Sequence, residues 1–341
     1  MTTLTLHPHT PTPPAPPTPP APLTPLALPT TAPWTRCNPT PPLTTTVPRE
    51  YVHRTSHAEV FLTACEPTAP HTYTLTGQWP RAHTFFTSPD GTSHDPLQAG
   101  ETIRQIGLYL CHAHYNIPLT HNILLHTLDF TTNPDHLHIG HTPTNLTMTA
   151  TITNPTHKAR QFTGQLHVDI HRDNHHTATG TAHFTCINPT TYQRLRQRHN
   201  TPTTNHTTPP HPPTTLPPTT TGRHHPHDVV LTPTNDPHHF TLTPNLHHPI
   251  LFEHTNDHHP GMVLIEAARQ ATHTLHHPHT PTITTITTHF HHYAELHTPT
   301  HIHAHPTTPH HTHITGTQNN NTIFNTTITT TPHTPTHHNP H

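Results

Sequence analysis

The sequence predicts an α+β fold built from two similar repeats, each with one long helix wrapped by an antiparallel sheet. Two strongly apolar runs, 95–115 and 260–270, have the character of buried helices. Each run is preceded by short strand-like segments and followed by several more. A Thr/Pro/His-rich tract over 199–226 separates the two groups and is typical of an interdomain linker. A chain of 341 residues is long enough for two domains.

The overall composition is unusual, with 47 Pro, 51 His, 28% hydrophobic residues and 9% charged residues. Thr/Pro-rich segments at 1–47 and 331–341 cannot bury enough apolar surface, so we expect them to be disordered. The folded repeats are then 48–198 and 227–330. The formal net charge of −3, with His neutral, provides no fixed basic field, and this argues against a nucleic acid partner.

The four cysteines, Cys37, Cys65, Cys111 and Cys186, are far apart in the sequence and form no CxxC pair. Free thiols in a reducing cytoplasm are the simpler interpretation. No apolar run approaches the ~18 residues of a transmembrane helix, and no secretory signal is visible at the N-terminus. We therefore expect a cytoplasmic protein that does not enter a membrane.

The first repeat begins where β-branched and aromatic residues replace the Thr/Pro pattern. Its helix over 95–115 can be capped by Asp95 and has Pro96 in the first turn. A short helix over 191–198 closes the repeat. The expected strands are 57–65, 71–79, 122–130, 146–153, 161–170 and 177–187.

The second repeat follows the same order. Its helix opens with Pro260 and Gly261, and Pro is favoured at the first helical position. The helix is apolar nearly all round, which indicates that it is enclosed on most sides. The expected strands are 228–231, 240–242 and 250–253 before the helix, and 282–293, 301–305, 311–317 and 322–330 after it.

The two helices support an internal duplication residue by residue. When Glu101 is aligned with Glu266, three further pairs also align. These pairs are His94 with His259, Arg104 with Arg269, and Gln105 with Gln270. A helix wrapped by an antiparallel sheet, occurring twice, is the double-hotdog arrangement. Because a lone hotdog leaves a sheet edge open, we expect the two repeats to pair within the chain.

Four segments resemble the A-factor biosynthesis (AfsA) hotdog family. YVHRTSHAEVFLTACEP over 51–67 resembles the start of that family's first repeat. The other three segments are QWPRAHTFF over 78–86, HDPLQAGETIRQIG over 94–107, and NDHHPGMVLIEAARQA over 256–271. They occur in the family's order, and the resemblance extends over 50–195 and 227–330.

The resemblance implies a cytoplasmic acyltransferase of γ-butyrolactone signal biosynthesis that needs no cofactor. Such an enzyme transfers a β-ketoacyl group from an acyl-carrier-protein thioester to the hydroxyl of dihydroxyacetone phosphate. The residues that the resemblance implies as catalytic are Glu101, Glu266 and Arg269. Two alternatives stay open: a hotdog dehydratase or thioesterase acting on acyl thioesters, and a degenerate, non-catalytic acyl-binding protein. The PG-x-x-x-x-EA helix is shared with dehydratases, but their HFPG loop is absent.

The chemistry of such a transfer can be assigned to the ionisable groups of the second helix. A carboxylate near the attacking hydroxyl can act as general base, and Glu266 is the best single candidate. Burial raises the pKa of a Glu while a neighbouring Arg lowers it, and the sequence leaves open which effect prevails. Backbone N–H groups near Gly261 can stabilise the developing oxyanion.

The acceptor's phosphate needs a cation, and an arginine can bind it bidentately. Arg269 or Arg104 suits this role, with Arg81 and Arg54 as weaker candidates. His259 and Asp257 precede the second helix directly, so they too can reach the pocket; we count Gly261, Arg104, His259 and Arg81 as substrate-binding.

Two simpler interpretations stand beside these assignments. A Glu–Arg pair three residues apart is most often a surface ion pair, so one of the two pairs can serve catalysis while the other only holds the repeats together. His-rich runs such as those over 291–297, 301–305 and 310–313 could chelate a metal. Because His is scattered through the whole chain, composition explains these runs better, and we expect no metal site.

Overall fold

The computed structural model describes residues 44–331 except 159–160, 200–214 and 254–256. Most of the terminal segments expected to be disordered, and the first part of the expected linker, therefore lie outside the described residues. Six strands belong to the first repeat: β1 (Leu62–Ala69), β2 (Thr72–Trp79), β3 (Asn122–Thr132), β4 (Thr144–Lys158), β5 (Gln161–Arg172) and β6 (His175–Ile187). Six belong to the second: β7 (Leu231–Pro233), β8 (His239–Leu242), β9 (Thr282–Phe290), β10 (His301–Thr308), β11 (His311–Gln318) and β12 (Asn321–Thr331).

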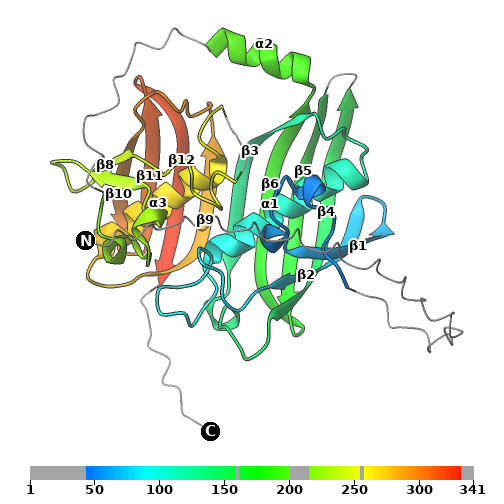
Figure 1. Ribbon diagram of the computed structural model, residues 1–341, viewed down its shortest axis with the longest axis horizontal. Coiled ribbons are helices and arrows are strands. Elements are labelled where there is room, and N and C mark those ends of the chain that lie inside the picture. The colour runs from blue at the N-terminus through cyan, green and yellow to red at the C-terminus, as the bar shows by residue number, and fades with distance from the viewer. Residues whose placement is uncertain (1–43, 159–160, 200–214, 254–256, 332–341) are drawn as a thin grey trace, which may run out of the picture. The chain divides into compact units, whose positions relative to one another are not determined.

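The described strands form one antiparallel sheet in the order β1-β2-β4-β5-β6-β3-β9-β12-β11-β10-β8-β7 (Figure 1). The two repeats join where β3 pairs with β9, in a register from Thr127 opposite His289 to Thr131 opposite Thr285. The Asp129 carboxylate also accepts a hydrogen bond from the Thr288 N–H at 3.0 Å. The expected pairing of the repeats within the chain is thus confirmed.

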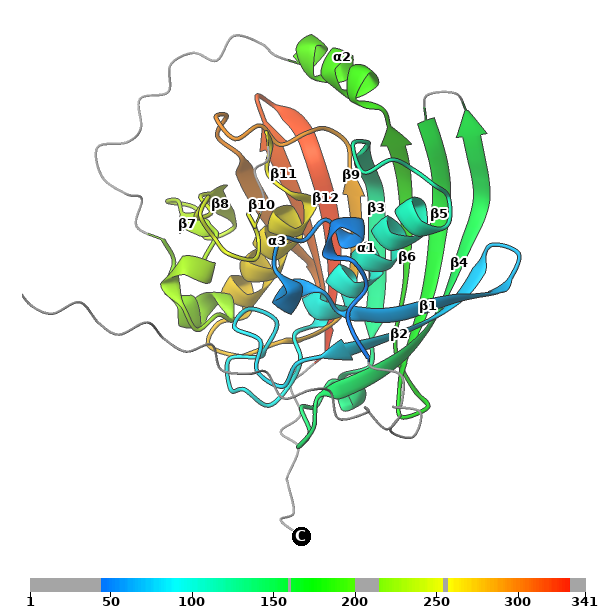
Figure 2. The ribbon, with the colours of Figure 1, turned by 45° about the vertical axis from the view of Figure 1, so that its right-hand side comes forward.

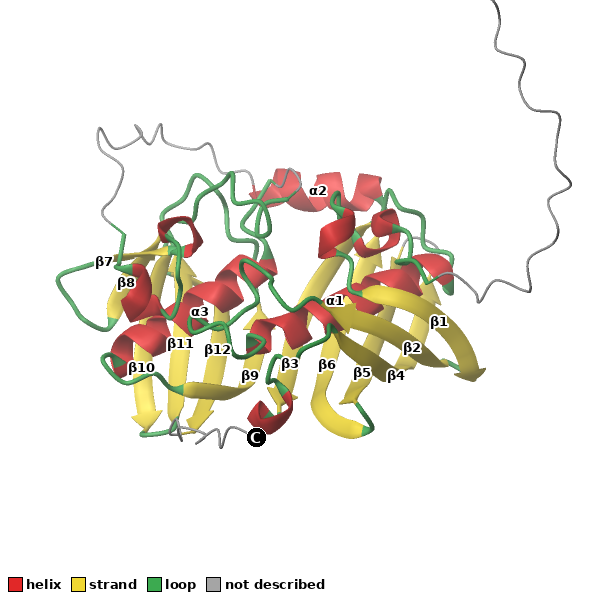
Figure 3. Cartoon of the chain, turned by 60° about the horizontal axis from the view of Figure 1, so that its bottom comes forward, coloured by secondary structure: helices red, strands yellow, loops and turns green. Residues whose placement is uncertain are grey.

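Three α-helices accompany the sheet: α1 (Pro96–Ala113), α2 (Pro189–His199) and α3 (Gly261–His276). The long helices α1 and α3 lie on the same side of the sheet, each against its own repeat (Figure 2, Figure 3). Gly100 permits the close packing of α1, because a Cβ there would lie 2.7 Å from the ring of Phe130 on β3. This is the double-hotdog fold that the sequence predicts.

Short 3-10 helices occupy several loops: η1 (Arg49–Val52), η2 (His57–Glu59), η3 (Pro134–His136), η4 (Pro218–Thr221) and η5 (Pro226–Asp228). Two of them replace parts of expected strands. Residues 57–59 form η2 because the Ser56 hydroxyl accepts the Ala58 N–H and turns the backbone. Residues 226–228 form η5, so the strand expected over 228–231 begins only at Leu231.

The strand expected over 250–253 is wrong, since these residues form a turn. The cause is a side chain: His248 Nδ1 accepts the N–H groups of Ile250 and Leu251 at 3.2 and 3.0 Å. Backbone donors used in this way cannot pair with a neighbouring strand. The other expected strands and helices are present, with different ends. In the part of the chain that is described, no helix combines the length and apolarity needed to cross a membrane.

Candidate active site

A cavity of about 620 Å³ lies between the two repeats. Its volume is in the range of small-molecule binding pockets. The apolar part of its wall is formed by α1 and the strands behind it, and includes Ile103, Gly107, Leu108, Leu125, Leu166 and Phe184. Its polar residues include Arg54 after η1, Arg104 on α1, and His258 and His259 just before α3. The cavity wall therefore combines apolar side chains with two arginines, whose charges Glu101 and Glu253 balance.

The first turn of α3 forms one wall of this cavity, through Pro260, Gly261 and Met262. Pro260 is the N-cap, and no side chain caps the helix there. The first N–H groups of a helix have no helical acceptor, and the N-terminus carries partial positive charge. The N–H groups of Gly261 and Met262 are therefore the donors that this wall presents.

One ion cluster, here called the open cluster, consists of Arg54, Glu101, Arg104, Gln105 and Glu253. Glu101 is fully buried and accepts hydrogen bonds from Arg104 Nε and Nη2 at 2.8 Å each and from Gln105 Nε2 at 2.9 Å. Arg54 Nη2 approaches Glu101 to 2.7 Å, and Arg54 Nη1 binds Glu253 at 2.8 Å. Burial alone would raise the pKa of Glu101, but the guanidinium groups of Arg104 and Arg54 hold it well below its usual range.

A second ion cluster, here called the closed cluster, consists of Asp95, Arg223, Glu266, Arg269 and Gln270. Glu266 is fully buried and accepts from Arg223 Nε at 2.7 Å, Arg223 Nη2 at 2.5 Å and Gln270 Nε2 at 2.6 Å. Arg269 Nη2 lies 3.0 Å from Asp95 Oδ2 and 2.9 Å from the carbonyl of Gly222. All five side chains are buried, and none of the five lines the cavity.

The two clusters are built in the same way, from an arginine that follows a 3-10 helix. His53 ends η1 with a left-handed φ of 53°, and Gly222 ends η4 with φ 66°. The next residues, Arg54 and Arg223, each bind the glutamate of the helix in their own repeat. At Gly222 only glycine fits, because a Cβ would lie 2.7 Å from the ring of His273.

Each of these arginines also reaches the other repeat. Arg54 Nη1 donates to the Ile250 carbonyl at 3.0 Å, and Arg223 Nη1 donates to the Phe85 carbonyl. Each of the two arginines therefore connects the loop that contains it to the glutamate of its own repeat's helix and to a backbone carbonyl of the other repeat.

The clusters differ at the residue six positions before the helix glutamate. In the first repeat this residue is Asp95, whose Oδ1 caps α1 by accepting the Leu97 N–H at 3.0 Å while Oδ2 pairs with Arg269. In the second repeat it is Pro260, which has no carboxylate. Accordingly the side chain of Arg269 is 4% exposed, whereas that of Arg104 is 20% exposed and lines the cavity.

The structure brings some of the predicted site residues together and separates others. Arg104, His259 and Gly261 surround the cavity, and Glu101 holds Arg104 in place. Glu266 and Arg269 lie instead in the closed cluster.

Arg81 lies apart from the cavity, on the surface, where its Nε donates to the Gly140 carbonyl at 2.9 Å. Asp257 is bound by α2, since it accepts from Arg196 Nε at 2.9 Å and from the Tyr192 hydroxyl at 2.7 Å. Neither residue is therefore free to bind substrate in this structure.

Arg223 is the residue of the two ion clusters that the sequence analysis missed most clearly. It lies in the tract 199–226 that composition marks as a linker, yet it is only 3% exposed and holds Glu266. One signal was available: Arg223 is the only Asp, Glu, Lys or Arg in that tract.

His259 is a buried cavity residue, with 5% of its surface exposed. Its backbone N–H donates to the Ala294 carbonyl at 2.8 Å, while its ring Nδ1 has no hydrogen-bond partner among the described residues. The counterpart His94 is also buried, and its Nε2 lies 2.9 Å from the Thr144 hydroxyl. Burial lowers the pKa of both histidines to about 4, so both are neutral near pH 7.

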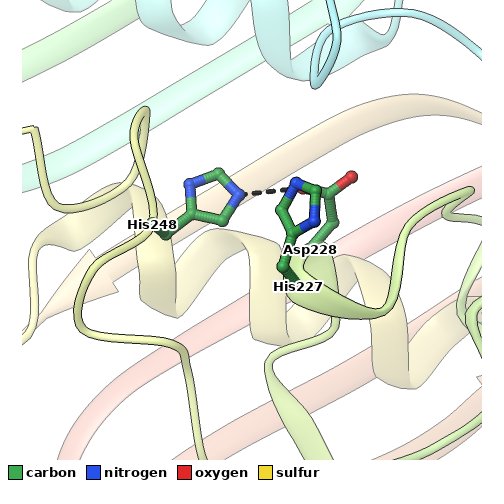
Figure 4. Close-up of side chains that lie close together, drawn as sticks. All are labelled: His227, Asp228 and His248. Carbon is green, nitrogen blue, oxygen red and sulfur yellow. Dashed lines mark hydrogen bonds and ion pairs between the residues drawn. The ribbon is translucent and has the colours of Figure 1, made fainter. Parts of the chain in front are cut away.

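Three side chains outside the cavity, His227, Asp228 and His248, lie close enough together to suggest a metal site (Figure 4). The hydrogen bonds of His248 argue against this. Its Nδ1 accepts two backbone N–H groups, so the proton resides on Nε2, which donates to Asp228 at 2.9 Å. Neither ring nitrogen then has a free lone pair for a metal.

The first repeat contains the same arrangement without a third ligand. His83 Nδ1 accepts the N–H groups of Phe85 and Phe86, and its Nε2 lies 3.2 Å from Glu59. The His248–Asp228 pair is therefore a repeated structural support, and the Asp228 carbonyl in turn accepts from Gln270 at 2.7 Å.

The chain is similar to known proteins in sequence and in fold. The A-factor biosynthesis hotdog domain matches residues 36–188 and 204–333. A 2-oxo-3-(phosphooxy)propyl 3-oxoalkanoate synthase of Streptomyces virginiae is 38% identical over 73% of this chain and 85% of its own length. A protein of the same name from Streptomyces coelicolor is 33% identical over 68% of this chain and 73% of its own. Among solved structures, the 12:0-ACP thioesterase from Umbellularia californica matches with a TM-score of 0.48 and 8% identity, over 79% of this chain and 100% of that one.

The buried histidines predict a pH dependence of stability. Because the folded-state pKa of His94 is lowered to about 4, the unfolded chain binds a proton that the folded chain does not between pH 6.5 and about 4. The free energy of unfolding should therefore fall as the pH falls through this window. Between neutral pH and about pH 4.5, His94→Gln should remove on the order of 2 kcal/mol of that fall, as urea denaturation measures it. His141→Gln, at an exposed position, is the control, and equal pH dependence of the two variants would contradict the assignment.

Proposed function

The chain belongs to the A-factor biosynthesis hotdog (AfsA) family, and from this premise we propose that it transfers a 3-oxoacyl group to dihydroxyacetone phosphate. The relatives' name, 2-oxo-3-(phosphooxy)propyl 3-oxoalkanoate synthase, describes the ester of these two components. The chain is accordingly an enzyme of acyl transfer. As acyl donor we propose a β-ketoacyl thioester of an acyl carrier protein.

The cavity between the repeats is the observation that carries this proposal. An acyl chain is apolar, and the channel between α1 and the sheet is lined by aliphatic and aromatic side chains. The phosphorylated acceptor is anionic, and the cavity wall also contains Arg54 and Arg104. Both substrates can therefore be held in one place, with the reacting groups at the first turn of α3.

The thioester carbonyl is proposed to lie at the N-terminus of α3. Gly261 has a free N–H at the position where the first repeat has Pro96, which has none. This N–H and the positive end of the helix can stabilise the oxyanion that forms as the carbonyl is attacked. Glycine at position 261 accommodates the ring of Phe290, from which a Cβ would lie only 3.2 Å away.

His259 is proposed as the general base, in place of Glu266. Both oxygens of Glu266 are bound by Arg223, and Glu266 does not line the cavity. Neither oxygen of Glu266 therefore faces a substrate in the cavity. Arg104 and Arg54 bind Glu101 in a similar way and hold its pKa well below its usual range. His259 lines the cavity and is neutral near pH 7, whereas its counterpart His94 does not line the cavity.

In the proposed reaction the acceptor hydroxyl gives its proton to His259 as its oxygen bonds to the thioester carbon. The C–S bond then breaks, and the proton passes from His259 to the leaving thiolate. Glu101 is a positioning residue here, because it orients Arg104 and Arg54. Glu266 and Arg269 are proposed to hold the two repeats together.

This division of roles predicts that two matched substitutions have different effects. Turnover is measured as the ester formed from a β-ketoacyl thioester and dihydroxyacetone phosphate, and stability is measured by urea denaturation. Glu101→Gln leaves Arg54 and Arg104 without their common anchor, so turnover should fall by up to ~100-fold. Glu266→Gln leaves Arg223 partly unpaired in the core, so the free energy of unfolding should fall by about 3 kcal/mol. Turnover per folded molecule should stay close to that of the wild type.

The same assay tests the proposed function itself. If the wild type forms enoyl product, or releases free acid without dependence on the acceptor, the chain is a dehydratase or thioesterase. If Glu266→Gln abolishes turnover of folded protein while Glu101→Gln does not, the active cluster has been assigned to the wrong repeat.

A second prediction concerns the base. His259→Gln should lower kcat by about 100- to 10,000-fold, the usual contribution of general base catalysis. His94→Gln, the counterpart beside the closed cluster, should leave kcat unchanged for folded enzyme. Because the pKa of His259 in the free enzyme is lowered to about 4, the wild-type kcat/KM should also lack a decrease near pH 6.5. Equal kcat values for the two variants would exclude His259 as the base.

A further inference from the structure

We propose that Arg104 binds the phosphate group of the acceptor, at the counterpart of the place that the Asp95 carboxylate occupies in the closed cluster. This inference rests on the proposed function for the identity of the ligand. Its geometry comes from the internal duplication. In the closed cluster the Asp95 carboxylate lies between a helix N-terminus and Arg269, and the corresponding place in the open cluster, beside Arg104, has no carboxylate.

The closed cluster shows how an anion is held. Asp95 Oδ2 lies 3.0 Å from Arg269 Nη2 and 3.4 Å from Arg223 Nη1. Its other oxygen accepts the Leu97 N–H in the first turn of α1 at 3.0 Å. An anion is thus fixed between a helix N-terminus of one repeat and the helix arginine of the other.

The open cluster has a helix N-terminus and a helix arginine at the corresponding positions, but no carboxylate at the helix cap. Met262 is the counterpart of Leu97, and Arg104 is the counterpart of Arg269. Glu101 takes two of the N–H donors of Arg104, through Nε and Nη2, out of the five that a guanidinium has. The remaining donors belong to a partly exposed side chain in the cavity wall.

The backbone at the two helix starts is nearly the same, with φ −68° and ψ 136° at Asp95, and φ −58° and ψ 148° at Pro260. What differs is therefore the side chain at the cap: the first repeat supplies a second carboxylate there, and the second repeat leaves that place beside Arg104 to a ligand. Buried beside this place is His259, whose Nδ1 has no partner among the described residues. The counterpart His94 also has an unpartnered Nδ1, but of the two only His259 lines the cavity.

Glu253, the second acid of the open cluster, does not fill this place. Its Oε2 binds Arg54 at 2.8 Å, while its Oε1 is held by the backbone N–H groups of Thr55 and Ser56 at 2.9 and 2.5 Å. Glu253 therefore balances the charge of Arg54, as Asp95 does in part for Arg223. The N–H donors of Arg104 that Glu101 does not use are left for the substrate.

Phosphate is the anion that this reaction provides. The product named for the relatives carries a phosphooxy group, and a phosphate oxygen accepts from a guanidinium and a helix N–H as a carboxylate does. The Gly261 N–H, which has no counterpart at Pro96, stays available for the thioester carbonyl. The two substrates would then use different donors of one helix terminus.

The test places a carboxylate at the cap of α3, where the closed cluster has Asp95 at the cap of α1. In Pro260→Asp the new carboxylate should cap α3 and pair with Arg104, so the Tm should be unchanged or higher. The affinity for dihydroxyacetone phosphate and for inorganic phosphate, measured by calorimetry without acyl donor, should fall at least ~10-fold. Pro260→Asn, which can cap the helix without adding charge, should bind both within about threefold of the wild type.

Arg104→Gln provides the second variant. It should weaken phosphate binding by about 10- to 100-fold and raise KM for dihydroxyacetone phosphate by a similar factor. A fall in kcat with unchanged KM and phosphate affinity would overturn the inference, because Arg104 would then act on the oxyanion. Equal phosphate affinity in wild type, Pro260→Asp and Arg104→Gln would overturn it too.

Failure of the proposed function would look different. If the wild type forms no ester but binds inorganic phosphate in an Arg104-dependent way, the anion site stands and the acyl-transfer assignment fails. If ester is formed while phosphate affinity is the same in all variants, acyl transfer stands and the Arg104 site is excluded.

Discussion

The buried ion pair between a loop arginine and a helix glutamate is the interaction on which the rest of this structure depends. Arg54 holds Glu101 and donates to a carbonyl of the second repeat, and Arg223 holds Glu266 and donates to a carbonyl of the first. Removing one partner of such a pair leaves a buried charge, which is costly by several kcal/mol. Each pair therefore fixes three things together: the helix, the loop before it and the opposite repeat.

Function arises where the two copies of this design diverge. At the start of α1, Asp95 supplies a helix cap and a partner for Arg269, so that cluster is complete within the chain. At the start of α3, Pro260 supplies neither, and Arg104 faces a cavity. One side-chain difference thus separates a structural cluster from a binding cluster, with little change in the backbone. On the proposed assignment, the duplication provides a stabilising cluster in one place and a binding site in the other.

Periodicity and the alignment of the two helices were enough to predict the double hotdog, the pairing of the repeats and the position of Gly261. The strand expected over 250–253 failed because the His248 side chain takes its backbone donors, a contact that has no signature in the local pattern. Glu266 looked like the base because its helix is apolar and opens with Pro-Gly. Its partner Arg223 lies in a tract whose composition indicates a linker, so the sequence alone could not show that Glu266 is occupied.

The central claim is that the cluster around Glu101 binds substrate, whereas the cluster around Glu266 is closed by Asp95. A crystal structure of the protein with bound dihydroxyacetone phosphate tests this claim most directly. The claim predicts one phosphate group, in contact with Arg104 at the first turn of α3, with Asp95 still bound to Arg269. A phosphate that displaces Asp95 and binds Arg269, with the cavity beside Arg104 empty, would contradict it.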